Sequence, residues 1–129
     1  MNLQKFYDNA CTSLRTYGNP YGSRYSREWA WVNHDNPNER CAIARFIKGN
    51  TSIEVVENLK KELKLSKHID PIAAVPLVGE IVQLFDSYAF EINNKVSLEY
   101  HLKEWADHYN LKYSEASAVD FKPVCEEIY

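Results

Sequence analysis

Apolar residues recur at spacings of three and four positions over residues 3–17, and this period predicts an amphipathic helix. The apolar face of the helix consists of Leu3, Phe6, Tyr7, Ala10, Leu14 and Tyr17. The opposite face, which we expect to meet solvent, consists of Lys5, Asp8, Asn9, Thr12 and Arg15. Gly18 and Pro20 follow directly, and both residue types are typical of the end of a helix.

A second helix is predicted over residues 52–65. The sequence TSIE places Thr51 at the N-cap and Glu54 at the third helical position, which is the pattern of a capping box. Its apolar stripe consists of Val56, Leu59 and Leu63, and the lysines at 60, 61 and 64 face water.

The next apolar period runs over residues 71–92. Asp70 followed by Pro71 is typical of a helix start, because proline has no N–H to leave unpaired in the first turn. Pro76 is expected to kink or restart this helix. Its predicted core face consists of Val78, Ile81, Val82, Phe85, Tyr88, Ala89 and Ile92.

A further helix is predicted to begin after Ser97, as its N-cap, and to run to about Asn110. The core stripe of this helix consists of Leu98, Leu102, Trp105 and Tyr109. The remainder, SEASAVDFKPVCEEIY, has a weaker pattern that is compatible with a short helix on either side of Lys122–Pro123.

The stretch of residues 17–46 admits two interpretations. In the first, which the cap and terminator residues favour, a helix spans residues 37–48 with Asn36 as N-cap and Gly49 as terminator. In the second, the aromatic and β-branched residues of 28–33 and 40–47 form a β-hairpin. The sequence therefore predicts a mainly α, compact bundle of about five helices, in one globular domain over residues 1–129, with an irregular aromatic-rich loop after the first helix. The alternative is an α+β fold with a hairpin at about 28–47.

Composition narrows the class of protein. Hydrophobic residues make up 45% and charged residues 26% of the chain, which is ordinary for a soluble globular domain. The net charge of −3 argues against nucleic acid as the partner, because phosphate-binding surfaces are usually basic. Three cysteines without CxxC spacing indicate reduced thiols, and no segment is apolar enough over its length to cross a membrane. We therefore expect a cytoplasmic protein.

The segment 17–31 combines tyrosine, tryptophan and arginine, which are the side chains that dominate binding hot spots. Its predicted binding residues are Tyr21, Arg24, Tyr25, Arg27 and Trp29. The competing explanation is structural, and we expect one of the two tryptophans at 29 and 31 to fill the core.

Two alternatives would make the protein an enzyme. Cys41, close to a predicted helix start and on the side of Arg45 and Lys48, would act as a nucleophile with His34 as its base. A small semi-buried thiol is the plainer explanation of Cys41, and a polar turn is the plainer explanation of the His34-Asp35 pair.

The other alternative is a metal site. His101, Glu104 and His108 form one stripe at the edge of their helix, and imidazole and carboxylate are ligands for zinc. A single helix rarely completes such a site, so a further ligand such as His68 would be needed. A polar helix flank is the simpler interpretation.

No phosphate-binding loop, nucleophile elbow or HExxH pattern is present in the sequence. We therefore expect a small, soluble, non-catalytic interaction protein, of the kind found among microbial or phage inhibitors, immunity proteins and counter-defence proteins. The expected partner is a protein or a small ligand, with no cofactor and no membrane. A small hydrolase or transferase is the alternative. The sequence does not indicate the oligomeric state.

Overall fold

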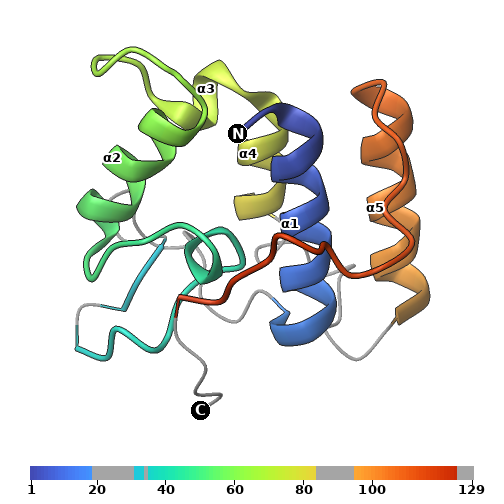
Figure 1. The fold of residues 1–129 in the computed structure, drawn as a ribbon, viewed down its shortest axis with the longest axis horizontal. Helices are drawn as coiled ribbons and strands as arrows, with labels where there is room; N and C mark the ends of the chain where they lie inside the picture. Colours follow the sequence, from blue (N-terminus) through green and yellow to red (C-terminus); the bar gives the residue numbers. More distant parts are fainter. Residues whose placement is uncertain (19–30, 34, 84–94, 125–129) are drawn as a thin grey trace.

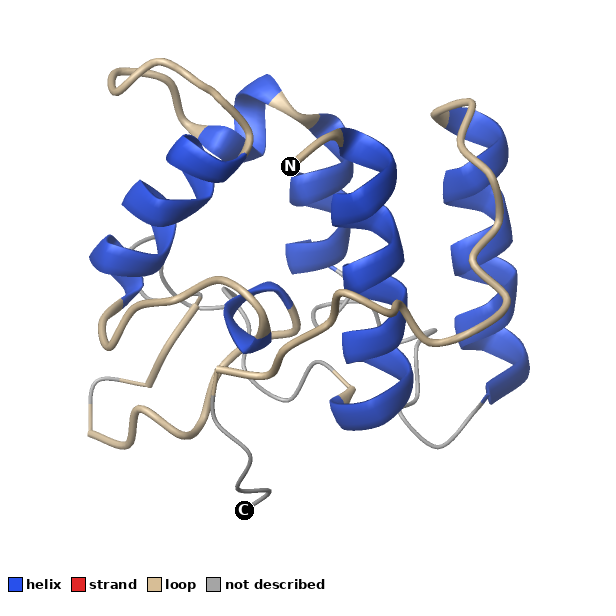
Figure 2. Ribbon diagram, in the orientation of Figure 1, coloured by secondary structure: helices blue, strands red, loops and turns tan. Residues whose placement is uncertain are grey.

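The computed structural model describes residues 1–18, 31–33, 35–83 and 95–124, and its elements are helices. In chain order they are α1 (Leu3–Tyr17), the 3₁₀ helix η1 (Ile43–Arg45), α2 (Ser52–Glu62), α3 (Pro71–Ala74), α4 (Pro76–Gln83) and α5 (Lys95–His108). Helix α1 occupies the middle of the molecule, with α2 and α5 on opposite sides of it and α4 behind it (Figure 1). The mainly helical fold is confirmed. The hairpin alternative is not supported, because the described ranges contain no sheet (Figure 2).

Helix α1 has the bounds that its apolar period predicts. Asn2 caps its start, with the side-chain oxygen accepting a 2.8 Å hydrogen bond from the Lys5 N–H. Gly18 ends it at a positive φ of 72° and donates its N–H to the Leu14 carbonyl. Its buried surface is wider than predicted, because Asn9 and Thr12, assigned above to the solvent face, are only 4% and 5% exposed.

The next helices follow their predicted start signals. Thr51 caps α2 and accepts a hydrogen bond from the Glu54 N–H, although α2 ends at Glu62 rather than at residue 65. Asp70 caps α3 by accepting a hydrogen bond from the Ile72 N–H. Pro76 restarts the helix, as predicted: it is the first residue of α4, and Val75 before it is extended. The predicted continuation to Ile92 runs into residues outside the described part.

Helix α5 begins at Lys95, two residues before the predicted cap Ser97, and ends at His108. Its predicted core stripe is confirmed for Leu98, Leu102 and Trp105, which are buried, whereas Tyr109 lies just after the helix and is half-buried. The Tyr7 hydroxyl donates a 2.6 Å hydrogen bond to the Leu102 carbonyl and so ties α5 to α1.

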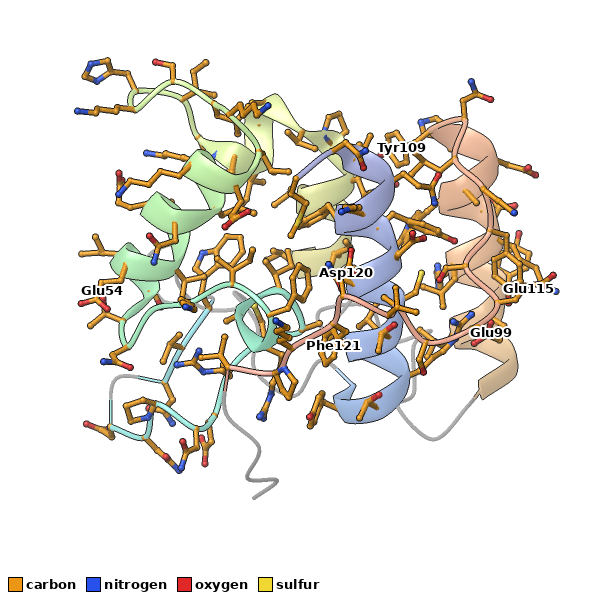
Figure 3. The ribbon with its side chains drawn as sticks, viewed as in Figure 1. Glu54, Glu99, Tyr109, Glu115, Asp120 and Phe121 are labelled. Atoms are coloured by element: carbon orange, nitrogen blue, oxygen red, sulfur yellow. The ribbon has the colours of Figure 1, made fainter. Side chains whose placement is uncertain are left out.

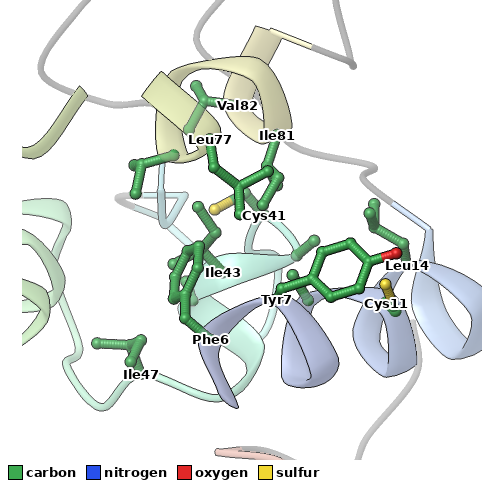
Figure 4. Packing of buried hydrophobic residues seen from close by; sticks show 14 of the residues in the cluster. Phe6, Tyr7, Cys11, Leu14, Cys41, Ile43, Ile47, Leu77, Ile81 and Val82 are labelled. Atoms are coloured by element: carbon green, nitrogen blue, oxygen red, sulfur yellow. The ribbon is translucent and has the colours of Figure 1, made fainter. Parts of the chain in front are cut away.

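One apolar cluster joins these elements. Its fully buried side chains come from α1, from the loop around η1, from α2, from α4 and from α5. Figure 4 shows the centre of this cluster, with Phe6 and Tyr7 of α1 facing Ile43 of η1 and Leu77 and Ile81 of α4. Trp31 is 2% exposed and belongs to the same cluster, so the expectation that one of the two tryptophans fills the core is confirmed.

The helix predicted over residues 37–48 is wrong. Asn36 forms a turn instead of a cap, accepting the Glu39 N–H at its carbonyl and the Asn38 N–H at its side chain. The only strand pairing in the described residues is an isolated antiparallel bridge between Val32 and Arg40. A helix here would use the backbone carbonyls of this segment as acceptors for its own backbone N–H groups. In the structure, three of the carbonyls in this loop accept hydrogen bonds from the Arg40 guanidinium instead.

These three acceptors define the loop. The Arg40 Nε, Nη1 and Nη2 atoms donate to the carbonyls of Pro37, Ala44 and Gly49 at 2.7, 2.9 and 2.7 Å. Arg40 is 2% exposed, so its charge is held inside the protein by these backbone dipoles. The loop from Pro37 to Gly49 is consequently folded around the Arg40 side chain.

Residues 111–124, called the tail below, cross the face of α1 and run from α5 toward η1 (Figure 1). The tail is held to α1 by a pair of hydrogen bonds between Gln4 and the Lys112 backbone, both 2.9 Å long. The Val124 N–H donates to the Arg45 carbonyl at its far end, at 2.7 Å. The short helix allowed before Lys122 is wrong, since residues 111–121 contain only irregular chain, a bend and a turn. The helix allowed after Pro123 falls mostly on residues outside the described part.

Candidate functional site

A cavity of about 670 Å³, lined by both polar and apolar side chains, lies where α1, the loop after η1, the start of α2 and the tail meet. This volume is within the range of small-molecule sites, which is about 300–1,000 Å³. The lining residues that carry the argument below are Asn9, Phe46, Lys48, Glu54, Asp120 and Lys122. We call it the Asn9 cavity.

Asn9 lines this cavity from the second turn of α1. Its side chain is 4% exposed, and within the described part of the chain its Oδ1 atom is buried without a hydrogen-bond partner. Thr12, on the same side of the helix, shows the usual arrangement: its hydroxyl donates to the Asp8 carbonyl and accepts from the Ala118 N–H. An unpaired buried acceptor is rare in a native protein. The Arg15 Nη1 atom is also buried without a partner in the described residues, but it is a donor and does not line this cavity.

One wall of the cavity is the loop 46–50, which α2 holds in place. The Asn58 side chain donates to the Lys48 carbonyl at 2.9 Å, and the Asn50 N–H donates to Glu54 at 2.7 Å. Gly49 has φ at 144°, and a Cβ atom there would lie 2.7 Å from the Val55 backbone nitrogen. Only glycine fits this close approach of loop and helix.

The tail forms the other wall. Asp120 is held by a 3.2 Å ion pair with Lys5, and Phe121 packs against Phe46 with ring centroids 6.1 Å apart. Figure 3 labels Glu54 on α2 and Asp120 on the tail, the acidic residues of the two walls.

The charges around the cavity are unevenly matched. The carboxylate of Glu54 accepts a backbone N–H, and that of Asp120 pairs with Lys5. Lys48 and Lys122 also line the cavity, and within the residues that the structure describes neither takes part in an ion pair. Together with Lys5, three lysines therefore stand against the two carboxylates of Glu54 and Asp120, so positive charge is in excess at this site.

A second polar cluster fastens the tail to α5. The Arg15 guanidinium donates to both Glu99 oxygens, at 2.9 and 2.7 Å, and the Tyr113 hydroxyl donates to the same carboxylate. The hydrogen bonds from Arg15 hold the pKa of the Glu99 carboxyl below its usual range, against the opposing effect of burial. Here the charges are matched by the protein itself.

Comparison of the chain with protein-family models, with curated proteins and with solved structures finds no match.

The predicted binding residues Tyr21, Arg24, Tyr25, Arg27 and Trp29 lie outside the described residues, as does His34. The binding prediction for this segment therefore stays a prediction.

The structure corrects the expected environment of Cys41. This residue was placed on a polar helix side with Arg45 and Lys48, but it is 1% exposed and lies in the apolar cluster near Leu77 and Ile81 (Figure 4). Burial raises the pKa of its thiol to about 11, so the thiol stays protonated at neutral pH. Cys41 is buried because residues 37–48 do not form the predicted helix, whose polar side would have exposed it.

His101, Glu104 and His108 all lie on α5, as predicted. The His101 ring lies 6.2 Å from that of Trp105, and the His108 ring is perpendicular to that of Tyr109 at 4.7 Å. In the described ranges, no three His, Cys, Asp or Glu side chains are grouped so that they could hold a metal ion. None of the helices described has the length and apolar composition needed to cross a membrane.

The Asn9 cavity could not be predicted from the sequence, because four separate segments build it. One signal for a covered face was nevertheless present. Between Asp8 and Arg15, α1 carries only small or uncharged residues, Asn9, Thr12 and Ser13 among them, which is unusual for a helix side in full contact with water.

Proposed function

We propose that this protein is a small, non-catalytic binding protein and that the Asn9 cavity holds its ligand. The observation that carries the proposal is the buried Oδ1 atom of Asn9, which has no partner within the described part of the chain. An unsatisfied buried acceptor costs a protein about 1–3 kcal/mol. A ligand that donates a hydrogen bond to this atom offsets that cost when it binds.

The lining supports binding rather than chemistry on the ligand. No histidine or cysteine is among the described lining residues of the cavity. Cys11 and Cys41 are buried, with the pKa of the first raised to about 12 by burial and that of the second to about 11. Such thiols are poor nucleophiles at neutral pH. Free thiols also suit the reducing cytoplasm, which is where we place the protein.

A class of inhibitor, immunity or counter-defence protein remains compatible with this proposal. In such a protein the Asn9 cavity would receive a side chain or chain end of the partner. Contact through the segment 17–31 would be additional to it, and it rests on the sequence alone.

The proposal is tested by ¹⁵N-HSQC spectra of the protein with a fragment library of neutral, cationic, anionic and zwitterionic compounds. We expect hits that shift the backbone amides of Lys48, Gly49 and Asn50 together with the side-chain amide of Asn9. These shifts should be lost in Asn9→Leu, which keeps the branching and the number of side-chain heavy atoms but removes the amide. A library that moves none of these signals, or moves them equally in Asn9→Leu, would overturn the proposal.

The absence of catalysis through Cys41 has its own test. In the folded protein at pH 7.5, iodoacetamide should label Cys41 no faster than Cys11, and both should react at once in urea. Rapid labelling of Cys41 in the folded protein would favour the enzyme alternative.

A further inference from the structure

The Asn9 cavity presents two lysines and one unpaired acceptor, and these features together restrict the chemistry of its ligand. We propose that the cavity selects small organic anions that carry a hydrogen-bond donor next to the anionic group. Hydroxy acids and acylated amino acids are examples of this class. The inference rests on the proposed function above and specifies the ligand of the same site.

The anionic group of the proposed ligand is inferred from the charged residues around the cavity. Asp120 is paired with Lys5, whereas Glu54 accepts the neutral Asn50 N–H and keeps its negative charge, so one unpaired carboxylate stands against two lysines. The ammonium groups of Lys48 and Lys122 come from opposite walls and have no ion-pair partner in the described chain. An anion between the two walls would therefore be attracted without first breaking an ion pair of the protein.

The hydrogen-bond donor of the proposed ligand is inferred from Asn9. Its Oδ1 atom accepts hydrogen bonds only, and the described chain supplies none to it. The χ2 torsion of asparagine is broad, so a small rotation of the amide turns Oδ1 toward a group in the cavity. A ligand with an O–H or N–H satisfies this atom, whereas a simple anion leaves it unpaired.

An apolar part of the ligand is also accommodated. Phe46 contributes its ring to the lining and is fixed between Phe6 and Phe121, at centroid distances of 5.7 and 6.1 Å. It therefore offers a rigid apolar surface, against which a hydrocarbon or aromatic group of the ligand can pack.

Four related probes separate these contributions. Mandelate carries an anion, a hydroxyl donor and a phenyl ring; phenylacetate lacks the donor, mandelamide lacks the charge, and 2-amino-1-phenylethanol replaces the anion with a cation. Their dissociation constants are measured by HSQC titration at fixed ionic strength. We expect mandelate to bind about tenfold more tightly than phenylacetate, which is the usual effect of one well-placed hydrogen bond. Mandelamide and the amine should bind more weakly still.

Variants assign the effect to the residues named. Lys48→Gln and Lys122→Gln should each weaken mandelate binding about threefold to fivefold and leave mandelamide unchanged. Lys61→Gln is the matched control, because Lys61 is exposed on α2 outside the cavity, and it should leave both constants unchanged. Asn9→Leu should remove the difference between mandelate and phenylacetate.

The outcomes distinguish this inference from the proposed function. If the neutral or cationic probe binds as tightly as mandelate, or if Lys61→Gln has the same effect as the two cavity lysines, the ligand class is wrong while the cavity remains a binding site. If none of the four probes shifts a cavity amide but other fragments do, the ligand class is again wrong. If nothing in the whole library shifts one, the binding function itself fails.

Discussion

Arg40 and Asn9 are both buried polar side chains, 2% and 4% exposed, but the protein treats them in opposite ways. The guanidinium of Arg40 donates to three backbone carbonyls, those of Pro37, Ala44 and Gly49. The Oδ1 atom of Asn9 accepts from nothing in the described chain. Burial of a charged group is much more costly than burial of an amide, and yet the charge is the better satisfied of the two.

The difference separates a structural role from a binding role. The partners of Arg40 belong to the loop that it organises, so the arginine acts as the local core of a segment with little regular structure. The Oδ1 atom of Asn9, by contrast, forms no hydrogen bond that stabilises the described part of the free protein. The two regions meet at Gly49, whose carbonyl binds Arg40 and whose backbone lines the Asn9 cavity.

The largest expected effect is the loss of the Arg40 network. Arg40→Met keeps the aliphatic stem but leaves three carbonyls without their donor, and we expect the free energy of unfolding to fall by about 3–5 kcal/mol. Urea denaturation measures it. The stability of Arg40→Lys should lie between that of Arg40→Met and that of the wild type, because one ammonium group cannot reach all three acceptors. A loss of less than about 1 kcal/mol would show that the loop does not depend on Arg40.

Gly49→Ala should cause the next largest loss in the free energy of unfolding, because it strains the backbone at Gly49, where the Arg40 loop and the Asn9 cavity meet. The added Cβ would lie 2.7 Å from the Val55 nitrogen and 2.8 Å from its Cγ2 atom, on a backbone with φ at 144°. We expect a loss of about 2–3 kcal/mol together with shifted amide signals around the cavity.

Gly79→Ala is the matched control in α4. There the nearest side-chain atom, Cγ2 of Ile72, would be 3.2 Å from the new Cβ, and the φ angle is not in the positive region. Alanine is the better helix former, which offsets the tight contact, so the net change should stay within about 1 kcal/mol. Equal losses at Gly49 and Gly79 would contradict the special role of the loop.

The Arg15–Glu99 pair should have a smaller, pH-dependent effect. Since the pKa of the Glu99 carboxyl is lower in the folded protein than in the unfolded chain, its stabilisation is complete above the ordinary value of about 4.3. It is lost as the pH falls through the folded value. Glu99→Gln should cost about 1–2 kcal/mol at pH 7, a modest amount because the two side chains are 23% and 33% exposed.

Thermal unfolding of the wild type and Glu99→Gln between pH 7 and pH 2 measures this effect. The difference between them should shrink toward acid pH and should also shrink in 1 M salt, which screens partly exposed charges. A difference that does not change with pH would mean that the carboxylate charge contributes nothing.

Most of the helical framework could be predicted from the sequence, because it depends on local signals. The apolar period of residues 3–17, the cap at Thr51 and the prolines at 71 and 76 each determine their element through neighbouring residues. The segment 37–48 failed for the opposite reason. Its cap-like Asn36 and terminator-like Gly49 are local signals that the Arg40 side chain overrides by binding carbonyls across the loop.

The site was less predictable than the fold. Whether Asn9 faces water or protein depends on the tail, which is more than a hundred residues away in sequence and binds α1 through Thr12 and Gln4. The amphipathic pattern of α1 alone assigned Asn9 and Thr12 to the solvent face. A pattern of residue types cannot show that another segment will cover that face.

The smallest expected effect has the opposite sign and separates the two roles most directly. Asn9→Leu removes an unpaired buried acceptor and improves helix propensity, so the free energy of unfolding should rise by about 1 kcal/mol. Thr12→Val is the matched control on the same covered side of α1. It deprives the Ala118 N–H of its acceptor and should lower stability by about 1 kcal/mol.

If both substitutions destabilise the protein, Asn9 is an ordinary structural residue and the comparison with Arg40 loses its meaning. If Asn9→Leu stabilises the protein and also abolishes binding of mandelate, the asparagine is retained at the expense of stability. Such a cost is typical of residues kept for function, because within the described residues no hydrogen bond depends on the Asn9 Oδ1 atom.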